Sequence, residues 1–196
     1  MPSDIATPPS CVRLTDVQGI FLDAMERFVV RELGETGLRR IRELTGRADH
    51  AYVYDTTYPD EELTLIVQGV SQANGLPADE ILQKFAEGLV PGLLDVYGFL
   101  VNPRWTFMDF LLNTERVVHK AVRLNTPSAK PPAIKVRLLD TDTIAITYRS
   151  PRRLCSVAKG IIRGAATHYQ TRAEITEGRC MLRGDPECMI TVAVKT

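Results

Sequence analysis

A short segment near position 150 carries hydrogen-bonding side chains at every second residue. In the sequence "YRSPRRLC", Tyr148, Ser150 and Arg152 share one face of an extended chain, whereas Arg149 faces the other side. Arginine presents a planar fork that suits a carboxylate, and hydroxyl groups can satisfy the remaining lone pairs. The segment therefore fits a ligand that carries carboxylates, and it equally fits a polar strand end that leads into the next helix.

The second feature that could take part in chemistry is a histidine on an apolar helical stripe. In "FLLNTERVVHKAV", His119 shares a stripe with Leu112 and Val122, so its imidazole lies at the edge of an apolar surface, and the helix is expected to break near Asn113. A hydrogen-bonded histidine of a hydrophobic core would give the same pattern. A neutral imidazole held by a helix in an apolar pocket is also what a haem iron needs as its proximal ligand.

Three cysteines form the third group. Cys180 and Cys188 flank the sequence "MLRGDPE", so a hairpin loop centred on Gly184 would set them opposite each other across two strands. Cys155 begins a helix that is expected to pack on that sheet. Three converging thiolates suit zinc if one further ligand is present. Two buried thiols with a chance neighbour remain the alternative.

The rest of the sequence excludes several classes of function. It contains no Ser-His-Asp grouping, glycine-rich phosphate loop or paired-carboxylate motif, so hydrolase and phosphotransfer chemistry are not indicated. Acidic and basic residues balance at 24 each, which gives no support for binding to nucleic acid or anionic lipid. The N-terminus lacks the features of a signal peptide, and no apolar run reaches the length of a membrane span. We therefore expect a cytoplasmic location.

The apolar periodicity indicates helices over the first two thirds of the chain. Residues 1–15 are rich in Pro, Ser and Thr and are interpreted as a loose extension. Helical spacing extends from there to about residue 126. The first helix is expected to begin near Asp16 and end at Gly34, and Pro91 is expected to kink a later one.

The periodicity changes to two in the last third of the chain. Residues 133–196 predict two antiparallel hairpins, separated by a long amphipathic helix with apolar residues from Leu154 to Tyr169. The expected fold class is α+β, in which a helical N-terminal subdomain packs on a C-terminal antiparallel sheet with one long helix. We expect residues 16–196 to form a single domain.

Together, these motifs resemble a known family. The Y-x-S-x-R motif, the helix-borne His119 and the pair Pro131-Pro132 occur in the order and spacing of haem nitric-oxide/oxygen binding (H-NOX) domains, relatives of the haem domain of soluble guanylate cyclase. The likeness runs from about Val17 to the C-terminus and includes "FMDFL" and "GAATHYQ".

The resemblance implies a haem b site between the helical part and the sheet. It assigns His119 as the proximal iron ligand, and Tyr148, Ser150 and Arg152 as the residues that hold the two haem propionates. It also implies that Pro132 presses against the porphyrin and distorts it.

The resemblance further implies which gases bind. In oxygen-binding members, a tyrosine five residues beyond the arginine of the motif donates a hydrogen bond to dioxygen, and Val157 stands at that position here. The distal wall is expected to be apolar and to include Phe21, Met25, Leu89 and Val90. Nitric oxide and carbon monoxide should therefore bind, whereas oxygen should not form a stable complex.

The implied role is a sensor and not an enzyme. Because no effector domain is recognised in the sequence, signalling is expected to act in trans on a partner, which in this family is often a histidine kinase or a cyclic-di-GMP enzyme. A haem-independent thiol or zinc redox switch on the same scaffold is the alternative function. A haem enzyme such as a peroxidase is disfavoured because no distal acid-base residue can be placed.

The cysteines match those of a zinc-binding subgroup of bacterial H-NOX proteins, but the fourth ligand differs. Cys155, Cys180 and Cys188 have the spacing of that subgroup, and Glu177 stands where its members carry a histidine ligand. A carboxylate can bind zinc through oxygen, so a site of three cysteines and one glutamate is chemically possible. A Cys180–Cys188 disulfide and free thiols remain alternatives. Oxidation would release bound zinc.

Overall fold

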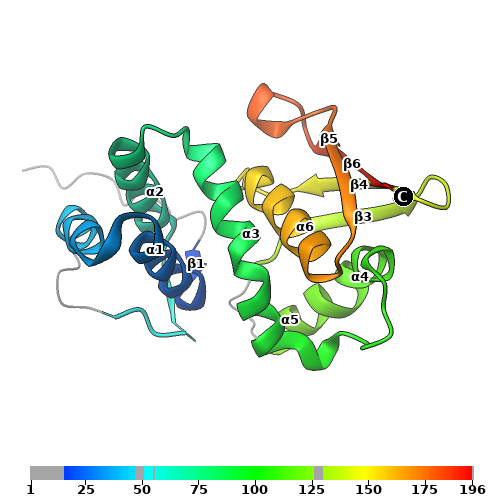
Figure 1. Ribbon diagram of the computed structural model, residues 1–196, viewed down its shortest axis with the longest axis horizontal. Coiled ribbons are helices and arrows are strands. Elements are labelled where there is room, and N and C mark those ends of the chain that lie inside the picture. The colour runs from blue at the N-terminus through cyan, green and yellow to red at the C-terminus, as the bar shows by residue number, and fades with distance from the viewer. Residues whose placement is uncertain (1–15, 47–50, 55, 126–129, 196) are drawn as a thin grey trace, which may run out of the picture.

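The structure is a computed structural model that describes residues 16–46, 51–54, 56–125 and 130–195 (Figure 1). The predicted N-terminal extension, residues 1–15, lies outside the described residues. None of the helices in the described part of the chain has the length and hydrophobicity that a membrane span requires.

The N-terminal part consists of a short two-stranded sheet and three helices. Strand β1 (Asp16–Gln18) pairs antiparallel with β2 (Thr57–Pro59), and the helices are α1 (Gly19–Leu44), α2 (Asp60–Asn74) and α3 (Ala78–Tyr97). The prediction that a helix begins near Asp16 is wrong by three residues, because these residues pair with β2 instead.

Gly34 and Gly75 interrupt or end helices with a left-handed backbone, whereas α3 continues past Pro91. Gly34 has a φ of 70°, a left-handed conformation that glycine adopts without a steric penalty, and it interrupts α1 as predicted. Pro91 lies inside α3, which continues beyond it to Tyr97, and the kink expected at Pro91 stays a prediction. The Asn74-Gly75 stop of α2 also uses a left-handed glycine, with a φ of 69° at Gly75.

The helix that carries His119 has three sections. A 3-10 turn, η1 (Gly98–Leu100), precedes α4 (Phe107–Asn113), which begins with a capping box between Thr106 and Asp109. The chain then continues as a π-helix, η2 (Thr114–His119), and as α5 (Lys120–Asn125). The expected break near Asn113 is therefore a change of helix type, and π-helical turns of this kind occur often at functional sites.

The C-terminal part is an antiparallel sheet in the order β3-β4-β6-β5. The strands are β3 (Ala133–Leu138), β4 (Thr143–Arg149), β5 (Arg172–Glu177) and β6 (Cys188–Lys195), and α6 (Cys155–His168) connects β4 to β5. The predicted α+β fold is confirmed. The second hairpin is shorter than predicted, because β5 ends at Glu177 and Cys180 lies in the loop before η3 (Met181–Arg183).

Helix α6 joins the two parts, since it lies between α3 and the sheet (Figure 1). Its Gly160 and Gly164 contact α3 so closely that a Cβ on Gly160 would lie 2.7 Å from the Cβ of Ala86. On the other side, Ile162 and Ala165 of α6 belong to the core over the sheet. The position of α6 is thus fixed by both halves of the molecule.

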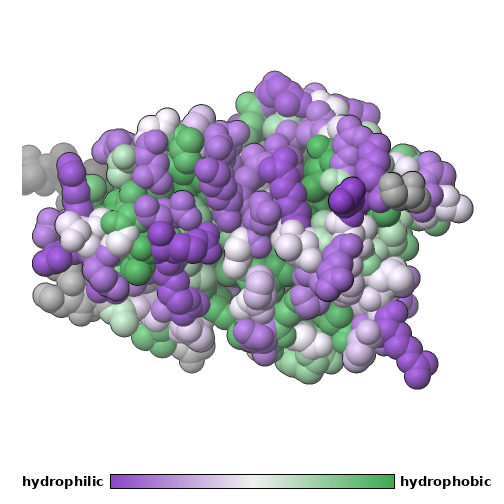
Figure 2. Space-filling view, viewed as in Figure 1, coloured by the Kyte–Doolittle hydropathy of each residue, from purple (hydrophilic) through white to green (hydrophobic). Residues whose placement is uncertain are grey.

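Hydrophilic side chains cover most of the face in Figure 2, with apolar areas over α1 and α2 and near α5. The exposed apolar side chains of the described chain include Leu44, Leu65, Phe99 and Leu124. Most large apolar side chains are instead buried in two main clusters, one among α1, α2 and α3 and one between α6 and the sheet.

Candidate functional site

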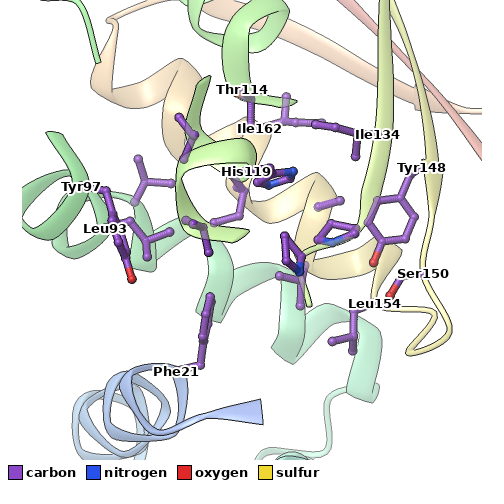
Figure 3. A pocket seen from close by; sticks show the side chains of 18 of the residues that line it. Phe21, Leu93, Tyr97, Thr114, His119, Ile134, Tyr148, Ser150, Leu154 and Ile162 are labelled. Carbon is purple, nitrogen blue, oxygen red and sulfur yellow. The ribbon is translucent and has the colours of Figure 1, made fainter. Parts of the chain in front are cut away.

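A cavity of about 300 Å³ lies between the helical part and the sheet (Figure 3). Its walls come from α1, α3, the segment around His119, α6 and the sheet. The lining is mainly apolar and includes Phe21, Val90, Leu93, Ile134, Val157 and Ile161. Cavities of this size with an apolar lining and a few polar groups are typical sites for small ligands.

The imidazole of His119 projects into this cavity (Figure 3). Its Nδ1 lies 2.9 Å from Oε2 of Glu115, and the other carboxylate oxygen of Glu115 accepts a hydrogen bond from Arg123 at 2.6 Å. A carboxylate can only accept, so Nδ1 carries the proton and Nε2 keeps its lone pair. The structure therefore offers a histidine nitrogen as a ligand on the cavity side.

Burial and hydrogen bonding set the charge states of this pair. Burial lowers the pKa of His119, and this effect outweighs the opposing hydrogen bond to Glu115. Burial acts to raise the pKa of Glu115, but the hydrogen bonds from His119 and Arg123 lower it overall. A neutral imidazole next to an ionised carboxylate is the result.

The three residues of the Y-x-S-x-R motif line the same cavity. Tyr148 and Ser150 are buried, and Arg149 between them is exposed, so the alternation continues although β4 ends at Arg149. Burial raises the pKa of Tyr148 to about 12, which keeps its hydroxyl protonated. The motif thus supplies two hydroxyls and one guanidinium to a mainly apolar space.

Arg152 also connects the sheet part to the helical part. Its Nε lies 3.1 Å from Oδ2 of Asp60, the first residue of α2, and its Nη2 donates to the backbone carbonyl of Asp16 in β1. Oδ1 of Asp60 is buried and has no hydrogen-bond partner among the described residues. The guanidinium is therefore held at the cavity by two groups of the helical part of the molecule.

The residues expected on the distal wall divide into two groups. Phe21, Val90 and Val157 line the cavity. Met25 and Leu89 are buried in the helical core and are not among the lining residues, because their side chains pack within the cluster of α1, α2 and α3. Pro131 and Pro132 both line the cavity.

Sequence reasoning missed three residues of this site. Tyr97 and Thr114 line the cavity, and Glu115 binds the ring of His119. Tyr97 follows Leu93 by one helical turn, so the helical spacing of the lining residues on α3 was the available signal. In Figure 3 the ring of Tyr97 extends toward the side of the cavity that carries Phe21.

The three cysteines form a second, separate cluster. Cys155, Cys180 and Cys188 are buried free thiols, and the sulfurs of Cys155 and Cys180 are 3.7 Å apart. Their sulfur atoms and one carboxylate oxygen of Glu177 all lie within 4.8 Å of one another. The structure therefore brings together all four residues that the sequence proposed as zinc ligands.

The hydrogen bonding of Glu177 leaves one oxygen unused. Lys159 donates to Oε2 at 3.0 Å, whereas Oε1 is buried without a hydrogen-bond partner in the described part of the chain. Burial raises the pKa of Cys155 to about 12 and also raises that of Cys188. Without a metal, the thiols of Cys155 and Cys188 stay protonated. A cation among these four groups would satisfy the unpaired oxygen and favour the thiolates, and three sulfurs with one oxygen suit zinc.

Comparisons with known proteins agree on one family. A family model described as Haem-NO-binding matches residues 18–177. The crystal structure of an H-NOX protein from S. oneidensis in the Fe(II)NO ligation state is 30% identical, with a TM-score of 0.87 over 92% of this chain and 100% of that chain.

Two other solved structures extend this comparison. The NMR structure of the H-NOX domain from Shewanella oneidensis in the Fe(II)CO ligation state is 30% identical, with a TM-score of 0.83 over 92% of this chain and 99% of that chain. The unliganded Fe(II) H-NOX protein from K. algicida shares the fold at 20% identity, with a TM-score of 0.81 over 92% of this chain and 97% of that chain. No curated protein matches the chain.

Proposed function

Because the chain belongs to the Haem-NO-binding (H-NOX) family of haem-based gas sensors, we propose that its cavity holds haem b with His119 as the proximal ligand. One observation carries the proposal: a neutral imidazole, fixed through Nδ1, projects into an apolar cavity. When bound, haem would supply an iron that can take a diatomic gas.

Tyr148, Ser150 and Arg152 would bind the two propionates. Carboxylates that enter a largely apolar cavity lose their hydration, and this loss must be offset by hydrogen bonds and positive charge. The two buried hydroxyls and the guanidinium at the cavity meet this need. Pro132, which lines the same cavity, would contact the porphyrin and distort it.

The distal side is proposed to favour nitric oxide and carbon monoxide over oxygen. Bound dioxygen carries negative charge and needs a hydrogen-bond donor, whereas the other two gases do not. Phe21, Val90 and Val157 offer no donor, and Met25 and Leu89 lie behind this wall.

The gas signal is proposed to reach a separate partner in the cytoplasm, either a histidine kinase or a cyclic-di-GMP enzyme, so this chain acts as a sensor without catalysis of its own. The sensor role of the family and the resemblance of the motifs support this part of the proposal. Residues 16–196 would act as one domain, since α6 packs against both α3 and the sheet.

An absorbance experiment tests the haem function. The purified full chain is supplied with haem, reduced, and exposed in turn to nitric oxide, carbon monoxide and air. Stoichiometric haem uptake and new spectra with the first two gases are expected. A chain that takes up no haem would refute the proposal, and a persistent oxy spectrum in air would refute the oxygen part alone.

The cysteine cluster favours a second function, a zinc-dependent thiol switch. Cys155, Cys180, Cys188 and Glu177 would bind one zinc ion, and the buried, unpaired Oε1 of Glu177 is the observation that supports it. Oxidation of the thiolates would release the metal and loosen the junction between β5, β6 and α6.

Elemental analysis of protein purified under reducing conditions tests this function. About one zinc per chain is expected for the wild type. Glu177→Gln should lower this content, and peroxide should release the metal. Zinc far below stoichiometry would leave free thiols, or a Cys180–Cys188 disulfide, as the state of the cluster.

A further inference from the structure

Both carboxylate oxygens of Glu115 are occupied by side chains of the same helical segment. Oε2 lies 2.9 Å from Nδ1 of His119, and Oε1 accepts from Nη2 of Arg123 at 2.6 Å. Glu115, His119 and Arg123 are spaced four positions apart in the sequence, so they lie along one face of η2 and α5. They form a linear relay in which the carboxylate stands between the imidazole and a cation.

The relay is partly shielded from water at its imidazole end. The side chain of His119 is 18% exposed, that of Glu115 is 32% exposed, and that of Arg123 is 42% exposed. A charge on Glu115 therefore acts on the ring through a partly desolvated contact, whereas Arg123 at the outer end is more strongly screened.

A carboxylate partner changes the ligand properties of an imidazole. It fixes the ring orientation and the tautomer, and it pulls the Nδ1 proton away from the ring, which makes Nε2 a stronger donor to a metal. A cation on the far side of the carboxylate draws negative charge toward itself and weakens this effect. Glu115 should then make Nε2 a stronger donor to the metal, and Arg123 should make it a weaker one.

We propose that Glu115 is a positioning residue that strengthens the bond from His119 Nε2 to the haem iron, and that Arg123 moderates this effect. The inference rests on the proposed haem function. Hydrogen bonding to an axial ligand is one of the ways in which a protein sets the reduction potential of haem. A more basic Nε2 favours the ferric state, so Glu115 lowers the midpoint potential and Arg123 raises it.

Three single variants of the haem-loaded full chain separate these effects. Glu115→Gln keeps a hydrogen-bond acceptor for Nδ1 but removes the charge, and Arg123→Gln removes the cation and leaves the carboxylate. Arg116→Gln is the matched control, because Arg116 is a cation on the same segment that donates to Asn113 and not to Glu115. The measurements are the iron–histidine stretching frequency, by resonance Raman spectroscopy of the ferrous protein, and the midpoint potential.

Glu115→Gln should lower the stretching frequency and shift the ferric-to-ferrous preference about tenfold toward the ferrous state, which corresponds to about 59 mV for a one-electron couple. Arg123→Gln should shift both quantities in the opposite direction, and the control should match the wild type. A general structural disturbance would move both variants the same way, so opposite signs support the relay.

The inference is overturned if haem binds through His119 and both variants keep the wild-type frequency and potential, or if both shift in one direction. Failure of the underlying function gives a different result. In that case the wild type takes up no haem, or His119→Gly leaves its spectrum unchanged, and the inference falls together with the haem site.

Discussion

Arg152, which lines the cavity, forms an ion pair with Asp60, with Nε 3.1 Å from Oδ2, although the two residues lie 92 positions apart in the sequence. The pair links the loop after β4 to the first turn of α2. A propionate that binds Arg152 must share the guanidinium with this carboxylate. Asp60 would therefore hold the proposed propionate anchor in position and also compete for it.

Asp60→Asn should destabilise the haem-free protein by about 1 kcal/mol, because asparagine keeps an acceptor for Nε of Arg152 but loses the negative charge that pairs with the guanidinium. Urea unfolding measures the change. Asp79→Asn is the matched control, since Asp79 also lies in the first turn of a helix but is exposed and contributes mainly through the helix dipole. Equal losses in the two variants would contradict a specific role of the ion pair.

Arg152→Ala should release haem faster than Arg149→Ala. Each charge-assisted bond to a buried carboxylate is worth about 1.5 to 3 kcal/mol, so the rate of haem loss should rise roughly 10- to 100-fold. Arg149 is exposed and does not line the cavity, which makes it the matched control. Transfer of haem to an excess of apomyoglobin gives both rates, and similar rates would exclude Arg152 as an anchor.

His119→Gly should abolish stable haem binding or make it dependent on added imidazole. The substitution removes the described histidine that lines the cavity, and free imidazole can occupy the space of the lost ring. The absorbance spectrum, with and without imidazole, measures the effect. An unchanged spectrum in the variant would disprove the ligand assignment.

Local pattern was enough to predict the fold class. Helical spacing changes to alternation near residue 133, and Val136, Ile146 and Ile190 then fall in register on neighbouring strands. The interruption of α1 at Gly34 was predictable because glycine is the residue that most easily adopts a positive φ. Strand β1 was not predictable, since three residues show no alternation and are ordered only by pairing with β2.

The site was predictable where motif and periodicity coincide. The motif residues stand at every second position, and all three side chains, Tyr148, Ser150 and Arg152, line the cavity. The partners Asp60 and Glu115 were not predicted. Asp60 is distant in sequence, and the four-residue spacing of Glu115 to His119 occurs on many exposed helices without function.

Gly160→Ala should destabilise the protein by about 1 to 3 kcal/mol, because the added methyl group would collide with the Gln83 carbonyl and with Ala86 of α3. Gly92→Ala is the matched control on α3. No atom lies within 4 Å of the place where its Cβ would stand, so the better helix propensity of alanine should stabilise it by up to about 1 kcal/mol. Thermal unfolding measures both changes. Destabilisation of similar size in both variants would show that α3 and α6 do not depend on this close contact.

Without metal, the cysteine cluster should make the stability of the fold depend on pH. The pKa of Cys155 is raised from 9.0 to about 12 in the folded chain by burial among the other thiols. The folded state therefore holds this proton more tightly than the unfolded state does. The resulting stability is fully present below about pH 9 and is lost as pH rises toward 12.

Between about pH 8 and about pH 10, the free energy of unfolding of the reduced, chelator-treated chain should fall by about 1.4 kcal/mol through Cys155 alone. Cys155→Ala should lack this part of the decrease and serves as the control. Zinc should also remove it in the wild type, because zinc-bound cysteines are already thiolates and have no proton to lose. Urea unfolding at each pH, with and without zinc, measures these slopes. An identical slope in both conditions would mean that zinc does not bind to the thiols of this cluster.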